Sequence, residues 1–299
     1  MSSFRSLLVP TDFSAHADAA VERAAWIAEG SGATLHLFHA CGVPVAGLAP
    51  YEFSLPAGTL DAMREAAATR LGEVAARLEG RGLTVTTTVS EGLPGDAIAP
   101  AVEARGADLV VLGTRGLTGL KHLLLGSVAE RALRTAPCPV LAVKDDDPAG
   151  PFERILCAVD FSESSERALD LAAELAREYG AELHIVHAVD LPLTLMTPYE
   201  VAVPDGLIRE AREAAQRKLD GTLERLRGRG LEAKGHLGDV PAAPAIADCA
   251  SQHGADLLVL GTRGHTGLKH LLLGSVAERT IQLSPCSVLV AKGSPKAKS

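Results

Sequence analysis

LGTRGLTGLKHLLLGSVAER, at Leu112–Arg131, returns at Leu260–Arg279 as LGTRGHTGLKHLLLGSVAER, with Leu117 changed to His265. Each copy follows an apolar run and carries three glycines at fixed spacing ahead of a serine. These residues are Gly113, Gly116, Gly126 and Ser127 in the first copy, and Gly261, Gly264, Gly274 and Ser275 in the second. A glycine-rich turn after a buried strand commonly binds phosphate. The repeat therefore predicts two copies of one anion-binding device.

The duplication extends over nearly the whole chain. The stretch ATLHLFHA at Ala33–Ala40 returns as AELHIVHA at Ala181–Ala188, and Asp12 is matched by Asp160 at the same offset of 148 residues. A repeat of 148 residues is long enough for each copy to bury its own core, which indicates two domains and not a solenoid. We expect domains over residues 1–145 and 152–293, joined by the polar, Pro- and Gly-bearing linker DDDPAGP at Asp145–Pro151. One two-residue slip is predicted between the copies, near Gly238–Ile246.

Composition excludes several classes of protein. The formal charge of −8 argues against a nucleic-acid surface, which needs a basic field. The five cysteines lack CxxC spacing, so neither a disulfide scaffold nor a cysteine zinc site is expected. No signal peptide and no membrane span are predicted, and the expected location is the cytoplasm.

Short apolar runs alternate with helical patterns in each copy. In the first copy the expected strands are Leu7–Pro10, Leu35–Ala40, Leu83–Val89, Ala107–Leu112 and Pro139–Val143. The expected helices run from a Ser14 cap to Gly30 or Gly32, and over Thr59–Leu78, Ala97–Ala104 and Ser127–Arg134. This alternation predicts an α/β fold, namely two tandem, doubly wound domains, each with a five-stranded parallel sheet of order 3-2-1-4-5.

The strand order explains why an aspartate and a glycine loop belong to one site. Ligands of open α/β sheets bind beyond the carboxyl ends of the strands where the strand order reverses, here between strands 1 and 4. Asp12 follows strand 1 and Gly113 follows strand 4. We expect Gly113 and Gly116 to adopt positive φ and to form an anion-binding nest, with the helix that begins after Gly126 offering free amides. An anionic Asp12 suits a ribose diol or an adenine amino group, so the ligand predicted is a nucleotide.

Neither common phosphate loop is present, because no GxxxxGK[ST] occurs and no GxGxxG follows the first strand. The pattern G-x2-G-x9-G-[ST], found twice, together with PTDFS at Pro10–Ser14 and AVDFS at Ala158–Ser162, resembles the ATP-binding branch of the universal stress protein family. The resemblance covers almost the whole chain and implies an adenine nucleotide alpha-hydrolase-like fold.

The resemblance also implies a site in each copy. The aspartate and the last residue of strand 2 would hold adenosine, and the glycine loop with its Gly-Ser step would hold the phosphates. The implied residues are Asp12, Ala40, Gly113, Arg115, Gly116, Gly126, Ser127 and Val128 in the first copy, and Asp160, Ala188, Gly261, Arg263, Gly264, Gly274, Ser275 and Val276 in the second. Family members often carry valine where this chain has Ala40 and Ala188, which leaves a larger adenine pocket. An alternative interpretation is that Arg115 and Arg263 are solvated loop residues. Likewise, the two aspartates would then only interact favourably with the dipole of the following helix.

The function that the resemblance implies is a nucleotide-responsive stress regulator or protective protein with up to two ATP sites, Mg²⁺ being an optional counter-ion. No catalytic constellation stands out, so weak ATP hydrolysis is left open. Two alternatives remain: an adenylyl-transferring enzyme of the same fold group, although SGGxDS and HxGH are absent, and a dimerising stress protein that binds no nucleotide. Family members pair through strand 5, which implies an intramolecular pseudo-dimer of Pro139–Val143 with Ser287–Ala291 and leaves a homodimer open.

Histidines recur on strand 2 at positions 36 and 39, and again at 184 and 187. A spacing of three places the two members of each pair on opposite faces of a strand, so no metal is expected to be shared within a pair. These histidines are interpreted as packing or hydrogen-bonding residues. Tyr51 and Tyr199 recur in the long loops after strand 2, where either a lid or common descent explains them.

Overall fold

The computed structural model describes residues 3–42, 58–116, 125–189, 205–262 and 273–292. The chain divides at Gly150 and Pro151 into two compact units, and each unit is described by itself. Leu117, His265, Tyr51, Tyr199, Arg263 and Gly264, all singled out above, lie outside the described residues.

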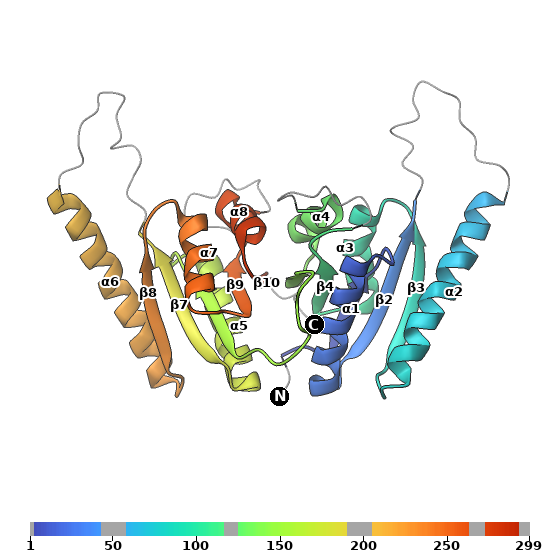
Figure 1. Ribbon diagram of the computed structural model, residues 1–299, viewed down its shortest axis with the longest axis horizontal. Coiled ribbons are helices and arrows are strands. Elements are labelled where there is room, and N and C mark those ends of the chain that lie inside the picture. Colours follow the sequence, from blue (N-terminus) through green and yellow to red (C-terminus); the bar gives the residue numbers. More distant parts are fainter. Residues whose placement is uncertain (1–2, 43–57, 117–124, 190–204, 263–272, 293–299) are drawn as a thin grey trace, which may run out of the picture. The chain divides into compact units, whose positions relative to one another are not determined.

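Strands and helices alternate strictly in the first unit, as the sequence predicts (Figure 1). Its elements are β1 (Ser6–Pro10), α1 (Ala15–Ser31), β2 (Thr34–Cys41), α2 (Thr59–Glu79), β3 (Val85–Glu91), α3 (Pro94–Arg105), β4 (Leu109–Gly113), α4 (Ser127–Thr135) and β5 (Val140–Val143). The strands are parallel and lie in the order β3-β2-β1-β4-β5, which confirms the predicted topology.

The second unit repeats this architecture. Its elements are β6 (Arg154–Ala158), α5 (Glu163–Tyr179), β7 (Glu182–Ala188), α6 (Asp205–Gly228), β8 (Ala233–Gly238), α7 (Ala242–Gln252), β9 (Leu257–Gly261), α8 (Ser275–Leu283) and β10 (Ser287–Ala291). Its parallel strands lie in the order β8-β7-β6-β9-β10. The fold is therefore a tandem of two doubly wound α/β domains.

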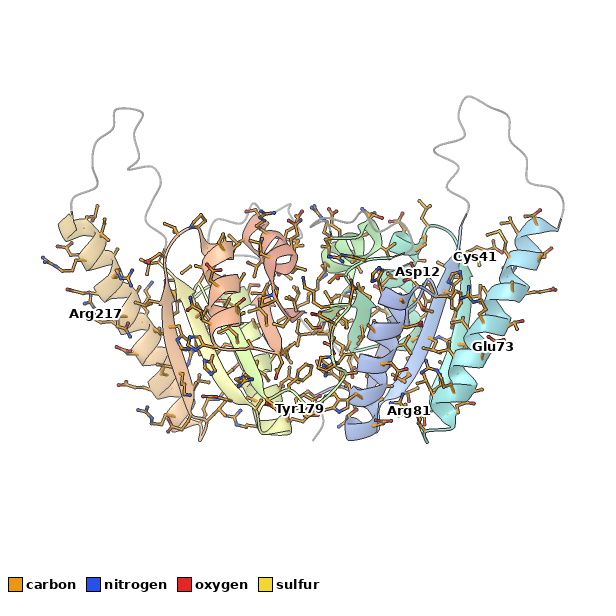
Figure 2. All side chains as sticks on the ribbon, viewed as in Figure 1. Asp12, Cys41, Glu73, Arg81, Tyr179 and Arg217 are labelled. Carbon is orange, nitrogen blue, oxygen red and sulfur yellow. The ribbon has the colours of Figure 1, made fainter. Side chains whose placement is uncertain are left out.

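Each sheet has a buried centre because helices cover both of its faces. In the first unit Arg77 of α2, and Arg81 just after that helix, form ion pairs with Glu22 of α1, while α3 and α4 pack together on the other face. The central strand β1 is accordingly apolar throughout its middle, with Leu7, Leu8 and Val9 at most 1% exposed. Side chains fill the space between sheet and helices (Figure 2).

Helix α1 begins and ends where the sequence predicts. The Ser14 hydroxyl accepts a hydrogen bond from the Ala17 amide and caps the first turn. Gly32 ends the helix in the left-handed conformation, with φ of 72°. Helix α3 begins earlier than predicted, at Pro94, because proline is well suited to the first helical position.

The predicted slip between the two copies is wrong. Ala40 pairs with Ser90 across β2 and β3, and Ala188 pairs with Gly238 across β7 and β8. Both pairs keep the offset of 148 residues found at Asp12 and Asp160. Gly92 and Gly238 are thus not structural counterparts, and matching them by residue type produced the apparent slip.

A buried ion pair attaches the predicted linker to the first unit. Arg23 of α1 is 1% exposed, and its guanidinium pairs with Asp147 and donates to the carbonyl of Gly150. The matched residue of α5 is Leu171, so this pair belongs to the first unit alone. The segment after β5 is therefore anchored by charge to the back of α1.

Candidate functional site

The carboxylate of Asp12 is fixed by the turn that connects β1 to α1. Its Oδ1 accepts hydrogen bonds from the Ser14 amide at 3.0 Å and from the Ser14 hydroxyl at 2.5 Å. This Asx turn holds the other oxygen, Oδ2, toward the glycine loop, where it lies 2.6 Å from the point that a Cβ of Gly116 would occupy. The side chain is thus oriented before any ligand binds.

The residue after each aspartate is strained. Phe13 has φ of 62° and Phe161 has φ of 63°, a left-handed conformation that bulky residues rarely adopt. The Phe13 ring lies 4.7 Å from the ring of His39, and the Phe161 ring 4.5 Å from that of His187. These phenylalanines are not among the residues predicted for the site. Their signal was available, because the same bulky residue follows the aspartate in both copies.

The glycine loop has a different backbone from the one predicted. None of Gly113, Gly116 and Gly126 has a positive φ, so the expectation of left-handed glycines forming a nest is wrong for these described residues. Close packing explains the first two glycines instead. A Cβ on Gly113 would lie 2.6 Å from the His16 carbonyl oxygen, and one on Gly116 would meet the carboxylate of Asp12. Gly113 lets β4 approach α1, and Gly116 leaves room for the carboxylate.

Helix α4 presents its amino end to this loop. Gly126 is its N-cap, and no side chain among the described residues caps it. The Gly126 amide donates to the Thr114 carbonyl at 2.9 Å, which closes the two ends of the loop on each other. The uncapped first-turn amides and the helix dipole favour an anion at this point.

These segments enclose one cavity of about 210 Å³. Asp12 comes from the end of β1, Ala40 from the end of β2, Gly113 from the end of β4, and Ser127 from the start of α4. All eight residues predicted for the first copy line it, namely Asp12, Ala40, Gly113, Arg115, Gly116, Gly126, Ser127 and Val128. Residues that are more than a hundred positions apart in the sequence, and that were predicted to lie together, thus line the same cavity. The volume is below the roughly 300–1,000 Å³ usual for small-molecule sites, so a whole nucleotide would extend beyond it.

A carboxylate at the rim holds the nearest cation. Asp145 accepts from Arg115 at 3.1 Å and lies 2.7 Å from Nδ1 of His16. Arg115 is therefore already paired, although its guanidinium has further N–H donors for a ligand. The residue matched to Asp145 in the second copy is Gly293, and the residue matched to His16 is Ser164. The two copies thus differ in charge at the rim.

The second copy repeats the described part of this geometry. Asp160 accepts from the Ser162 amide at 3.0 Å and from its hydroxyl at 2.6 Å. The Gly274 amide donates to the Thr262 carbonyl at 2.8 Å, and Gly274 is the N-cap of α8, again with no side-chain cap among the described residues. The predicted residues Asp160, Ala188, Gly261, Gly274, Ser275 and Val276 stand at the same places in their elements as their counterparts in the first copy.

The strand-2 histidines are hydrogen-bonded, as predicted. Nδ1 of His39 lies 2.8 Å from the carbonyl of Thr11, and Nδ1 of His187 lies 2.8 Å from the carbonyl of Val159. Both contacts tie the end of strand 2 to the loop that carries the aspartate.

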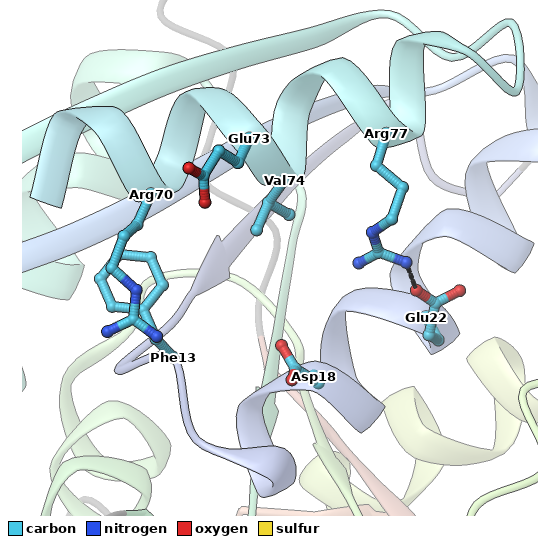
Figure 3. Close-up of a pocket in the computed structure, with 7 residues that line it drawn as sticks. All are labelled: Phe13, Asp18, Glu22, Arg70, Glu73, Val74 and Arg77. Atoms are coloured by element: carbon cyan, nitrogen blue, oxygen red, sulfur yellow. Dashed lines mark hydrogen bonds and ion pairs between the residues drawn. The ribbon is translucent and has the colours of Figure 1, made fainter.

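A second cleft, of about 360 Å³, lies between α1 and α2 (Figure 3). It is lined by Phe13, Asp18, Glu22, Arg70, Glu73, Val74 and Arg77. Burial by itself would raise the pKa of Glu22, but hydrogen bonds from Arg77 and Arg81 outweigh it and hold that pKa below its usual value. Arg70 lies 4.3 Å from the centre of the Phe13 ring. These contacts join the two helices, and five of the seven lining residues are charged, whereas small-molecule sites are lined mainly by apolar side chains.

Comparison with known proteins identifies the family. The universal stress protein family model matches residues 3–144 and again residues 151–292. The chain belongs to the universal stress protein family. A universal stress protein of Mycolicibacterium smegmatis is 32% identical over 305 residues, with 96% of each chain covered. The crystal structure of a universal stress protein from Archaeoglobus fulgidus superposes with a TM-score of 0.73 at 26% identity, again with 96% of each chain covered.

Single-domain members match one copy at a time. A universal stress protein of Bacillus subtilis is 34% identical over 147 residues, which is 47% of this chain and 99% of that protein. This chain is therefore a tandem member of the family, as the internal repeat predicts. Within the described residues no helix has the length and apolar character that crossing a membrane would require.

Proposed function

We propose that this universal stress protein binds ATP in the cavity between Asp12 and α4, and in the matching place of its second domain, and acts as a nucleotide-responsive stress regulator. The observation that carries the proposal is the convergence of all eight predicted residues of the first copy on one cavity. A carboxylate held by two hydrogen bonds faces one part of that cavity, and an uncapped helix start faces another. A nucleotide matches both, because its nucleoside offers hydroxyl and amino donors and its phosphates offer an anion.

The polarity of the cavity orients the nucleotide. Asp12 would accept hydrogen bonds from hydroxyl or amino groups of adenosine, because a carboxylate repels phosphate. Ala40, at the end of β2, would leave room for the base. The phosphates would lie toward the first amides of α4 and toward Arg115, where the helix dipole and the guanidinium favour anions. Bound Mg²⁺ would supply additional neutralisation of the phosphate charge.

The cavity has glycines at positions where a side chain would interfere with a nucleotide. Gly116 stands where a Cβ would collide with the carboxylate of Asp12. Gly126 contributes an amide to the closed loop and carries no side chain over the start of α4. Backbone groups can therefore approach a ligand closely from the glycine side of the cavity.

The nucleotide content of the protein tests the proposal directly. We expect protein purified under mild conditions to release ATP on denaturation, with up to two molecules per chain, and the emptied protein to bind ATP in calorimetry. If neither bound nor added nucleotide is detected, the chain is a stress protein that retains only the fold. If it turns over ATP repeatedly with release of AMP, it is an adenylyl-transferring enzyme and the regulatory role is wrong.

Strand 5 supports a second proposal, taken from the family resemblance alone. We propose that Pro139–Val143 and Ser287–Ala291 contribute to pairing between the two domains. Introducing aspartate at Val140, which is fully buried, would not separate pairing from folding. Cysteine cross-linking between introduced residues at the two strands is the better measurement, and failure of all such pairs to cross-link would contradict the pairing.

A further inference from the structure

Three histidines of the second domain converge from three different elements. His184 lies in β7, His236 in β8 and His253 at the carboxyl end of α7. One ring nitrogen from each can be chosen so that all three atoms lie within 4.8 Å of one another. The cluster is separate from the nucleotide site, since none of the three matches a residue that lines the cavity of the first unit.

Strand register explains the convergence. His184 is paired with Lys234, and His236 is paired with Val186, so both histidines stand on the same face of the sheet, two residues apart along it. Helix α7 packs on β7 and β8 (Figure 1), and His253 directly follows its last residue, Gln252. The ring centres of His236 and His253 are 4.0 Å apart, and those of His184 and His253 are 5.2 Å apart.

The hydrogen bonds of His184 are incomplete. Its Nδ1 lies 2.9 Å from Nε2 of His236, and the side chain is nearly fully buried. Its Nε2 is buried and makes no hydrogen bond within the described residues, although a carboxylate oxygen of Glu182 lies 3.4 Å away. A buried ring nitrogen without a hydrogen bond is costly. An ion bound at Nδ1 would leave the proton on Nε2, and a small shift would let it bond to Glu182.

The first domain has no such arrangement at the matched positions. His36 corresponds to His184, but its two ring nitrogens lie 2.7 Å from the Thr86 hydroxyl and 3.0 Å from the Ser6 hydroxyl. Thr88 and Arg105 stand where the second domain has His236 and His253, and Arg105 donates to Thr88. One copy of the fold therefore satisfies its strand-2 histidine with hydroxyl groups, and the other surrounds it with imidazoles.

We propose that His184, His236 and His253 form a binding site for a divalent transition-metal cation, of which zinc is the test ion. Imidazole is a good ligand for zinc, copper, iron and nickel. A tetrahedral zinc ion with Zn–N bonds of about 2.0–2.1 Å spaces its ligand nitrogens about 3.3 Å apart, which the cluster reaches with small side-chain shifts. His253 is only partly buried, so a solvent molecule could complete the coordination.

Charges around the cluster favour a cation in two ways. The cluster lies at the carboxyl end of α7, where the helix dipole is negative. Glu182 pairs with Lys234, so the nearest lysine is already balanced by a carboxylate. Glu182 also approaches the outer nitrogen of His184, as carboxylates do behind metal-bound histidines.

Zinc binding by the full chain, freed of metal and nucleotide, tests the proposal. A competing zinc indicator should report one site per chain with a dissociation constant in the micromolar range or tighter. The double variant His236→Thr and His253→Arg installs the residues that the first domain carries at these positions. It should weaken that binding at least a hundredfold while unfolding thermally as the metal-free wild type does. Cobalt should bind the same site and give visible absorption bands that the double variant lacks.

Two further variants keep the result decisive. Arg105→Ala, at the matched position of the first domain, should leave zinc affinity unchanged. His253→Arg alone changes only the partly exposed helix end, and should weaken zinc at least tenfold even if the double variant does not fold. Wild-type protein that binds no more zinc than these histidine variants would overturn the proposal. Because zinc is measured without nucleotide, the outcome is independent of ATP binding.

Discussion

Replacing Asp12 separates two contributions that the structure assigns to its carboxylate. Oδ1 holds the turn at Ser14, and Oδ2 points toward Gly116 in the cavity. Asp12→Asn keeps an oxygen for the Ser14 amide but removes the charge. Asp12→Ala removes both. The two variants should therefore differ in stability as well as in ATP affinity.

The magnitudes follow from the hydrogen bonds. A hydrogen bond to a charged group contributes about 1.5–3 kcal/mol, and a neutral one about 0.5–1.5 kcal/mol. Asp12→Asn should thus weaken ATP at the first site by roughly five- to tenfold, and Asp12→Ala by roughly ten- to a hundredfold. Loss of the turn at Ser14 should also lower the free energy of unfolding of Asp12→Ala by about 1 kcal/mol. Asp12→Asn should retain most of the wild-type stability.

Calorimetry is best done with the second site blocked by Gly274→Val, whose side chain would stand over the start of α8, so that one binding event is measured. Asp18→Asn is the matched control, because Asp18 is an acid in the first turn of α1 that does not line the cavity. If both Asp12 variants bind ATP as the Asp18 control does, Asp12 is not part of the site. If Asp12→Ala weakens binding only in proportion to its loss of stability, the carboxylate is structural.

Three other perturbations have defined outcomes. Arg23→Ala leaves Asp147 buried without its cation, and should lower the free energy of unfolding, measured in urea, by about 3–5 kcal/mol. A loss below about 1 kcal/mol, the usual value of an exposed pair, would show that the pair is dispensable. Asp145→Asn releases Arg115 toward the phosphates and should tighten ATP at the first site by roughly two- to fivefold, as expected for an exposed pair; weaker binding would mean that Asp145 itself supports the ligand. Burial raises the pKa of Cys249 to about 11, so the thiolate should be scarce at pH 8. Iodoacetamide should therefore label Cys249 far more slowly than an unfolded cysteine, as measured by mass spectrometry of the peptides. Equal labelling would contradict the burial of this thiol.

Sequence patterns predicted the topology, and the convergence of the first-copy residues on one cavity, because both depend on features with a fixed period. Apolar runs such as Leu109–Leu112 are typical of central strands in a parallel sheet, and the 148-residue repeat supplies each assignment twice. Once the strand order is known, Asp12 and Gly113 must meet at the switch point. No backbone detail enters that deduction, which is why it succeeded.

Details that depend on exact backbone geometry were not predictable in the same way. The glycines of the loop were expected to need positive φ, whereas Gly113 and Gly116 are required by the space that His16 and Asp12 occupy. The strained residue is Phe13 instead, whose φ of 62° no propensity rule would assign to phenylalanine. Close approach between distant segments, and strain imposed by tertiary structure, leave no periodic signal in a sequence.

The histidine cluster also depends on contacts between distant segments, which periodic patterns in the sequence do not reveal. Taken as a pair, His184 and His187 lie three residues apart on β7 and therefore on opposite faces of the strand. The proposed partners of His184 come from a neighbouring strand and a helix end, 52 and 69 residues further along the chain. The duplicated sequence does contain a usable signal, because histidine replaces Thr88 and Arg105 of the first copy at both positions. Differences between the copies, and not their shared motif, therefore indicate where the second domain has acquired chemistry of its own.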